Sequence, residues 1–181
     1  MTAAFPLSRS RPGGLDRPPF PSVPVKLVGE AGEMFPVAPG AKLYTDQPFT
    51  MEQIAPELRG LTGIRISQAA AAKDGVRVQF ELPEAAQVLV GFFRSERKGA
   101  AAVPPKDEWE AVLRNGIAVN GQPGFVVWSH ALPKGRNELD FGRGAYVVLG
   151  FIKREAQPEP RMVFFSQADA RRRPDLDWLF E

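Results

Sequence analysis

The side chains able to perform chemistry in this sequence are few, because it contains one histidine and no cysteine. His130 follows Ser129, and a serine near a histidine is the first arrangement to consider in nucleophilic catalysis. Neighbouring residues of a strand point to opposite faces, so we expect these two side chains to lie apart and His130 to be structural. The lack of cysteine excludes a thiolate nucleophile, a disulfide framework and Cys-based metal sites. We therefore predict no catalytic residue, no cofactor and no metal site.

Acidic residues are the other candidates for catalysis. Glu138 and Asp140 share one face of a predicted strand, where two carboxylates at the right separation would suit a glycoside hydrolase or lyase. Leu139 and Phe141 alternate with them and are expected to face the core, which favours solvated surface carboxylates. Asp46 is predicted to end a strand or cap the short helix that follows it, rather than to bind a metal ion.

Aromatic side chains offer a different kind of site. The apolar face of a sugar stacks on an exposed ring, so a carbohydrate-binding module keeps tryptophan or tyrosine on a solvent-facing surface. The candidates for such a platform are Tyr44, Trp109, Trp128 and Tyr146. Packing in the core is the alternative for all four rings, most strongly for the two that lie within apolar strands.

Charge and hydropathy exclude several further classes. The net charge is +2, from 23 Lys and Arg against 21 Asp and Glu, and residues 1–24 carry all of this excess. A nucleic-acid interface needs a basic face, so we predict no nucleic-acid partner. No apolar run reaches the roughly 18–20 residues that span a bilayer. Met1 is not followed by the apolar stretch of a signal peptide, which predicts a cytoplasmic chain, or an exported one whose leader has been removed.

The two ends of the chain differ from its middle. Residues 1–24 hold six prolines, which favours an extended arm that is either a disordered leader or a docking segment. Residues 166–181 form a C-terminal tail with an apolar tip, which is expected to fold back on its own sheet or to enter a groove of another protein. The predicted contacts with a protein partner in a larger assembly are Phe5, Leu7, Phe20, Leu176, Trp178, Leu179 and Phe180.

Residues 25–165 are predicted to form one all-β domain, an antiparallel β-sandwich or jelly roll. Residues 75–82 alternate strictly between apolar and polar side chains, which indicates a strand with one buried face. Residues 87–93 are more continuously apolar and therefore more central. Shorter strands are expected at 25–28, 34–37, 42–45, 61–66, 124–129, 137–141, 145–152 and, at an edge, 161–165.

Helices have little place in this pattern. Helical spacing of apolar residues predicts one short helix within 50–58, with Thr50 as its N-cap, and another within 107–113. The alanines at 69–72 precede a glycine turn, which favours a connector. Residues 94–106 are expected to form an exposed loop.

Several motifs together suggest a family. Leu43-Tyr-Thr-Asp-Gln-Pro-Phe49, Pro56-Glu-Leu-Arg-Gly60 and Gly144-Ala-Tyr-Val-Val-Leu-Gly150, with Pro104-Pro105 ahead of Trp109, lie within residues 40–153. In that span the chain resembles a β-sandwich accessory domain found near the ends of large bacterial polysaccharide-degrading enzymes and related surface proteins. Gln47 stands where that family usually has arginine. The resemblance implies a non-catalytic sandwich module that binds carbohydrate or packs on a catalytic neighbour.

Three hypotheses for function follow, from different classes. The first is a non-catalytic interaction or structural module that docks on a partner protein through its terminal arms. The second is a carbohydrate-binding module with an aromatic platform. The third is a glycoside hydrolase or lyase that uses Glu138 and Asp140. The absence of a recognisable catalytic constellation favours the first.

Overall fold

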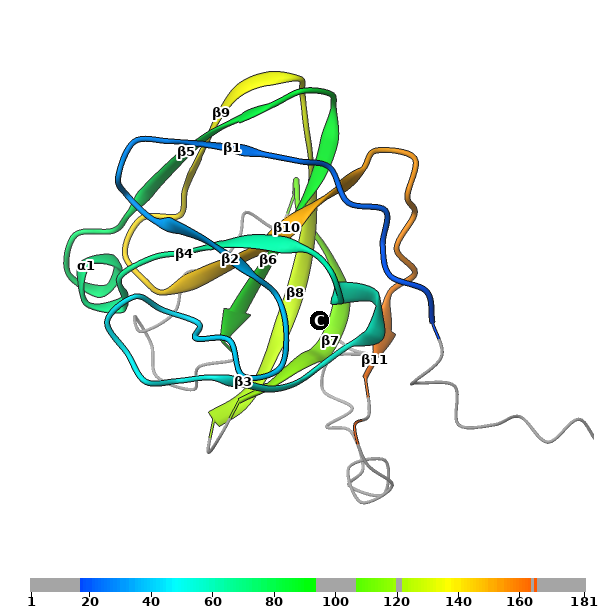
Figure 1. Cartoon of the computed structure of the whole chain (residues 1–181), viewed down its shortest axis with the longest axis horizontal. Coiled ribbons are helices and arrows are strands. Elements are labelled where there is room, and N and C mark those ends of the chain that lie inside the picture. Colours follow the sequence, from blue (N-terminus) through cyan, green and yellow to red (C-terminus); the bar gives the residue numbers. More distant parts are fainter. Residues whose placement is uncertain (1–16, 94–106, 120–121, 164, 166–181) are drawn as a thin grey trace, which may run out of the picture.

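The computed structural model describes residues 17–93, 107–119, 122–163 and 165, and this part of the chain is mostly antiparallel β-structure (Figure 1). Within it, two sheets form a sandwich-like arrangement, which confirms the predicted all-β class. The loop expected at 94–106, the arm before residue 17 and most of the C-terminal tail lie outside the described residues. No helix in the described ranges is long and apolar enough to cross a membrane.

The larger sheet has the strand order β11-β7-β8-β6-β10-β4-β2, with β3 also pairing with β7, and the smaller sheet has the order β1-β5-β9. All pairings are antiparallel except that of β11 with β7. The strands are β1 (Lys26–Val28), β2 (Glu33–Pro36), β3 (Met51–Ile54), β4 (Thr62–Arg65), β5 (Arg77–Leu82), β6 (Ala86–Phe93), β7 (Glu110–Val119), β8 (Gln122–Leu132), β9 (Gly135–Asp140), β10 (Tyr146–Lys153) and β11 (Arg161–Met162).

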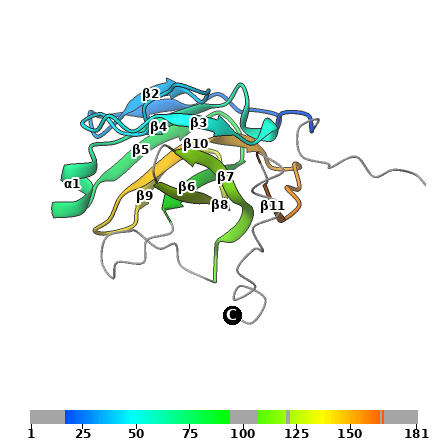
Figure 2. The ribbon, with the colours of Figure 1, turned by 90° about the horizontal axis from the view of Figure 1, so that it is seen from below.

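The central strands of the larger sheet are buried on both faces. Leu89 of β6 belongs to one hydrophobic cluster, with Phe35 of β2 and Met51 of β3, and Figure 2 shows β2, β3 and β4 as a layer over β6. Its neighbours Val88 and Val90 belong to a second cluster, which contains the inward residues of β5. This two-sided burial explains the continuous apolar run predicted for residues 87–93, because a strand covered on both faces has no polar side.

Strand β5 shows the opposite pattern and confirms the prediction made from its alternation. Val78, Phe80 and Leu82 are buried, whereas Arg77 and Glu81 are exposed. One face of the small sheet therefore packs on the core and the other is solvated.

The predicted helix at 50–58 is wrong. Residues 51–54 form β3, which pairs with β7, and Pro56–Leu58 form a single 3-10 turn, η1. Thr50 is therefore no helix N-cap; it makes an isolated β-bridge with Lys42. The strand expected at 42–45 is wrong as well, because beyond this bridge the segment forms no strand. Four residues of strand followed by a proline-initiated turn bury Met51, Ile54 and Leu58, the same positions that a helix would bury.

The predicted helix at 107–113 is also wrong, because this segment leads into β7. The register of β7 against β8 shifts between Ala111 and Leu113, which marks a β-bulge. A bulge lets two consecutive residues face inward, so Val112 and Leu113 are both buried, as is Trp109. Trp109 belongs to the second hydrophobic cluster and Val112 and Leu113 to the first, so burial on both faces together with the bulge imitates the spacing of one face of a helix.

A helix forms where a connector was expected. Gln68–Lys73 is α1, the one α-helix of the described ranges, and Ser67 caps it by accepting a hydrogen bond from the backbone N–H of Ala70 at 3.1 Å. Alanine has the highest helix propensity of the amino acids, and α1 contains four alanines. Gly75, with φ +81°, follows the end of the helix in the left-handed conformation that commonly terminates helices.

The described part of the N-terminal arm lies against the sandwich. The N–H of Val23 donates to the carbonyl of Phe151 at 2.8 Å, and the N–H of Lys153 donates to that of Pro21 at 2.9 Å. Val23 is 4% exposed and belongs to the second hydrophobic cluster. Residues 20–23 are therefore part of the packed structure.

Candidate functional site

His130 and Ser129 lie on opposite faces of β8. Ser129 pairs in register with Leu89 and His130 with Val88, and these two partners belong to different hydrophobic clusters. The His130 ring stacks on Trp109 with centroids 4.9 Å apart and an interplanar angle of 20°. Its Nδ1 lies 2.8 Å from the carbonyl oxygen of Glu108, so Nδ1 carries the proton that is donated. This geometry makes His130 a packed aromatic residue.

Three of the four rings considered for a sugar platform lie inside the sandwich. Tyr44 and Tyr146 have no exposed surface, and Trp109 is 7% exposed. The Tyr146 hydroxyl donates to the carbonyl of Val76 at 2.9 Å. Burial, and secondarily the charge of a nearby aspartate, raises the pKa of both tyrosines. A buried ring presents no face to a ligand, so Trp128, which is half-buried, is the remaining ring of this set.

The four rings do not form one surface: Trp109 and Tyr146 belong to one hydrophobic cluster, against which Trp128 packs, and Tyr44 belongs to the other. Trp109 makes an edge contact with Phe141 at 5.3 Å, and Phe141 makes one with Tyr146 at 4.7 Å. Tyr44 packs in the other hydrophobic cluster, on the opposite side of the large sheet. These contacts stabilise the core.

Glu138 and Asp140 lie on the solvated face of β9, where polar partners from β5 already bind them. Glu138 accepts a hydrogen bond from the side-chain amide of Gln79 at 2.7 Å, and Asp140 forms an ion pair with Arg77 at 2.8 Å. Both carboxylates therefore lie on an exposed sheet face and are already bound by side chains of β5. This arrangement does not support acid–base catalysis.

Asp46 caps α1, which begins at Gln68, and not the short helix that was predicted within residues 50–58. Its carboxylate accepts hydrogen bonds from Ser67 Oγ at 2.7 Å and from the N–H groups of Gln68 and Ala69 at 2.8 and 3.0 Å. Desolvation acts to raise the pKa of Asp46, but these hydrogen bonds outweigh it and lower the pKa. The aspartate of the Leu43–Phe49 motif thus ties that loop to the start of α1.

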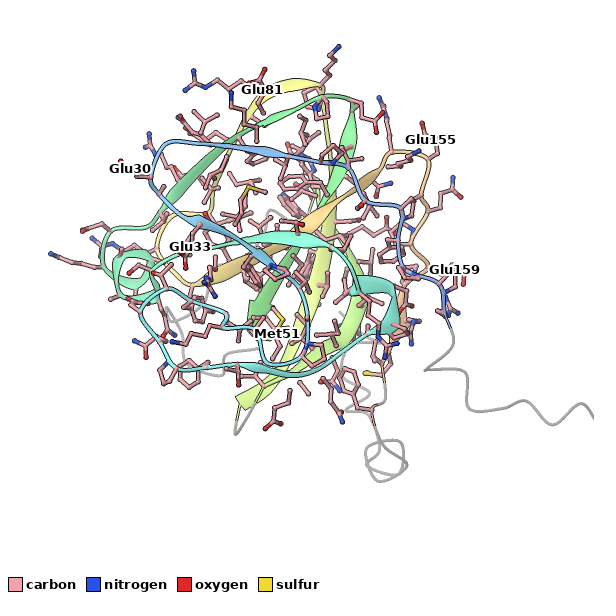
Figure 3. The ribbon with its side chains drawn as sticks, in the orientation of Figure 1. Glu30, Glu33, Met51, Glu81, Glu155 and Glu159 are labelled. Atoms are coloured by element: carbon pink, nitrogen blue, oxygen red, sulfur yellow. The ribbon has the colours of Figure 1, made fainter. Side chains whose placement is uncertain are left out.

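A groove of about 380 Å³ lies between the N-terminal arm and the segment that connects β10 to β11. One wall is formed by residues 17–21 and the other by residues 156–159, with Glu57 between them. Four of the ten lining residues are prolines, three of them in the arm, and Phe20 and Ala156 add apolar surface. Figure 3 shows Glu159 beside the point where the described chain begins. An exposed ion pair between Arg17 and Glu159, at 3.4 Å, links the two walls.

A buried ion pair supports this groove. Arg161 of β11 donates to both carboxylate oxygens of Glu57 in η1, each at 2.7 Å, and the two side chains are 12% and 5% exposed. The backbone N–H of Phe20 donates to the carbonyl of Glu57 at 2.9 Å. Gln87 of β6 holds the other wall by donating to the carbonyls of Arg154 and Ala156. Glu57 is thus the residue that joins the arm, η1 and β11.

Of the predicted partner contacts, the structure places Phe20, which lines the groove. The others, Phe5, Leu7, Leu176, Trp178, Leu179 and Phe180, lie outside the described residues. Sequence reasoning missed the pairing of Glu57 with Arg161, which are 104 residues apart. Its one sequence signal is a glutamate flanked by two apolar residues, Pro56 and Leu58. Among the described residues, no group of three or more His, Cys, Asp or Glu could hold a metal ion.

Comparison of the sequence with protein-family profiles finds no match, and neither does comparison with curated proteins. The structure is similar to part of a solved GH138 enzyme targeting pectin rhamnogalacturonan II, with a TM-score of 0.71 and 24% sequence identity. The likeness covers 80% of this chain but only 18% of the enzyme. The β fold is therefore one that also occurs as a small part of a large polysaccharide-degrading enzyme.

Proposed function

We propose that this protein is a non-catalytic β-sandwich module that docks on a partner protein, within a larger assembly or a multidomain enzyme. The groove between residues 17–21 and 156–159 carries this proposal, because it is a concave, largely apolar surface at the end of the sandwich where both terminal segments start. In the similar enzyme, a fold of this kind is 18% of a longer chain. Where domains of one chain meet, their interfaces resemble transient protein–protein interfaces of roughly 600–1,500 Å².

The rest of the described surface offers few apolar side chains to a partner. Met34 is the single large hydrophobic side chain classed as exposed in the described ranges, at 41%. On the outer face of the small sheet, charged side chains of neighbouring strands pair with each other, as Arg77 does with Asp140. Apolar residues suited to a contact are instead found around the groove and in the sequence of residues 176–180. A few large aromatic and aliphatic anchors supply most of the affinity of an interface.

Site-specific photo-crosslinking in the producing cells tests this proposal. A photoreactive residue replaces Gln157 in the groove wall, Trp178 in the tail, or Glu81 on the outer face of β5 as the control. We expect the first two positions to capture the same protein and the control to capture none. Binding of that purified protein should weaken at least about tenfold with Trp178→Ala, a change of about 1.4 kcal/mol. Equal capture from all three positions, or none from any, contradicts docking at this end.

Carbohydrate binding is the second candidate, and the half-buried ring of Trp128 is the observation that favours it. Affinity electrophoresis in gels containing pectic or other plant polysaccharides tests it. We expect a sugar that retards the native chain to lose its effect with Trp128→Ala, whereas Glu81→Ala, on the outer face of the other sheet, leaves retardation unchanged. Migration unaffected by every polysaccharide rejects this candidate.

A further inference from the structure

The groove adjoins the point at which the C-terminal segment leaves the sandwich. Glu159 lines the groove, and β11 begins two residues later at Arg161. Phe20 and Ala156 of the groove pack against the same hydrophobic cluster as Phe165, the last described residue. The apolar surface around the groove and the origin of the tail are therefore on one side of the core.

The tail is long enough to return to this groove. Residues 166–181 number sixteen, which corresponds to a span of roughly 50 Å at about 3.3–3.6 Å per extended residue. A short tether of this kind gives its end an effective concentration in the millimolar range. A second copy of the chain at micromolar concentration competes poorly with such an attached segment.

The chemistry of the tip fits the groove. Leu176, Trp178, Leu179 and Phe180 are apolar, and one large aromatic ring alone can bury about 150–250 Å². Asp175 and Asp177 flank Leu176 in the sequence. At the groove rim, the Arg17 side chain is 44% exposed and contacts Glu159, which is 78% exposed, at 3.4 Å, so its guanidinium keeps N–H donors free to bind a further carboxylate. The match is therefore mainly apolar: prolines, Phe20 and Ala156 of the groove face an apolar tip, and the Arg17–Glu159 pair lies at the rim.

We propose that in the free protein the C-terminal tip, residues 175–180 of the same chain, occupies this groove with Trp178 as its anchor. The inference rests on the proposed docking function, because it describes how the docking surface is kept covered until a partner replaces the tip. Binding of a partner then releases the tip, whose apolar residues become available for the contact.

Disulfide trapping tests this in the full-length chain, which has no cysteine of its own to interfere. Gln157→Cys in the groove wall is combined with Glu181→Cys at the end of the tail, and oxidation is followed on non-reducing gels. The matched control combines Glu181→Cys with Glu81→Cys on the outer face of β5. We expect the first pair to form an intramolecular disulfide at least about tenfold faster than the control pair, the ratio that a docking energy of about 1.4 kcal/mol produces.

Changing the tip separates docking from simple tethering. Replacing Trp178, Leu179 and Phe180 with serine keeps the tether length, and we expect it to reduce the trapping rate of the Gln157→Cys pair to that of the control. An unchanged rate overturns the proposal, because the tether alone then brings the cysteines together. Predominant intermolecular disulfides also overturn it, since a second copy is then the occupant. If trapping fails while photo-crosslinking from Gln157 captures a partner, the tip is rejected and the docking function stands.

Discussion

Breaking the ion pair between Glu57 and Arg161 is expected to destabilise the protein strongly. The two hydrogen bonds are both 2.7 Å long, and the side chains are 5% and 12% exposed, so water replaces a lost partner poorly. Glu57→Gln keeps the shape of the side chain but leaves the Arg161 guanidinium without a counter-charge. Removing one partner of a buried pair costs about 3–5 kcal/mol. Two charge-assisted hydrogen bonds at roughly 1.5–3 kcal/mol each give a similar range.

Urea unfolding followed by circular dichroism measures this cost. With an m-value of about 1–3 kcal/mol/M, a loss of 3 kcal/mol lowers the midpoint by roughly 1–3 M. The control is Glu33→Gln, which breaks the pair of Arg65 and Glu33, whose side chains are 23% and 52% exposed. We expect it to cost about 0–1 kcal/mol.

A double-mutant cycle then isolates the pair itself. Glu57→Leu combined with Arg161→Met removes both charges, and we expect it to be more stable than either single variant, because no uncompensated charge remains. The reasoning is refuted if Glu57→Gln costs no more than the Glu33 control, or if the two single losses simply add in the double variant. Either result means that solvent reaches the pair and that the pair does not hold β11 to η1.

Three further predictions concern the sandwich. Asp46→Ala should cost about 0.5–2 kcal/mol at pH 7 through loss of the cap on α1. Because the pKa of Asp46 is lowered in the folded protein, the stabilisation by its carboxylate is fully present above pH 3.8, the ordinary pKa, and is lost as the pH falls through the folded-state pKa. The native protein and the Asp46→Ala variant should therefore converge in stability in acid. Gly63→Ala should lower the melting temperature, because its Cβ would collide with the backbone oxygen of Val148; overpacking of this kind costs about 1–3 kcal/mol, and an unchanged melting temperature contradicts the tight approach of β4 to β10. Arg77→Ala should change stability by at most about 1 kcal/mol, because its pair with Asp140 is exposed, and a larger loss measured by urea titration contradicts that view of the small sheet.

Much of the β-structure could be predicted from the sequence because its signals are local. Alternation along residues 75–82 depends only on one wet and one buried face, and the structure has that strand at Arg77–Leu82. The continuous apolar run at 87–93 likewise identifies a strand covered on both sides. Pro36 restricts its strand to an edge position or places the proline at a strand end, and Pro36 is the last residue of β2, the terminal strand of the larger sheet.

The errors arose where long-range pairing changes a local pattern. The helical spacing of Trp109, Val112 and Leu113 arises because this segment is buried on both faces and its register against β8 shifts between Ala111 and Leu113, which no property of residues 107–113 alone reveals. The alanines at 69–72 become a helix because Asp46, more than twenty residues earlier, caps its first turn. Local spacing is overridden by strand pairing at 107–113, whereas at 69–72 the distant cap adds to the helix propensity that the alanines already have.

The sequence by itself determined the all-β class, the inward faces of the main strands and the lack of cysteine chemistry, because each depends on residue type and short-range order. Tertiary structure alone decided that Tyr44 and Tyr146 are interior, that Glu138 and Asp140 are held by partners on an open sheet face, and that Glu57 and Arg161 form one buried pair. The physical reason is that burial and ion pairing depend on which distant segments meet, and the order of strands in a sheet sets those meetings.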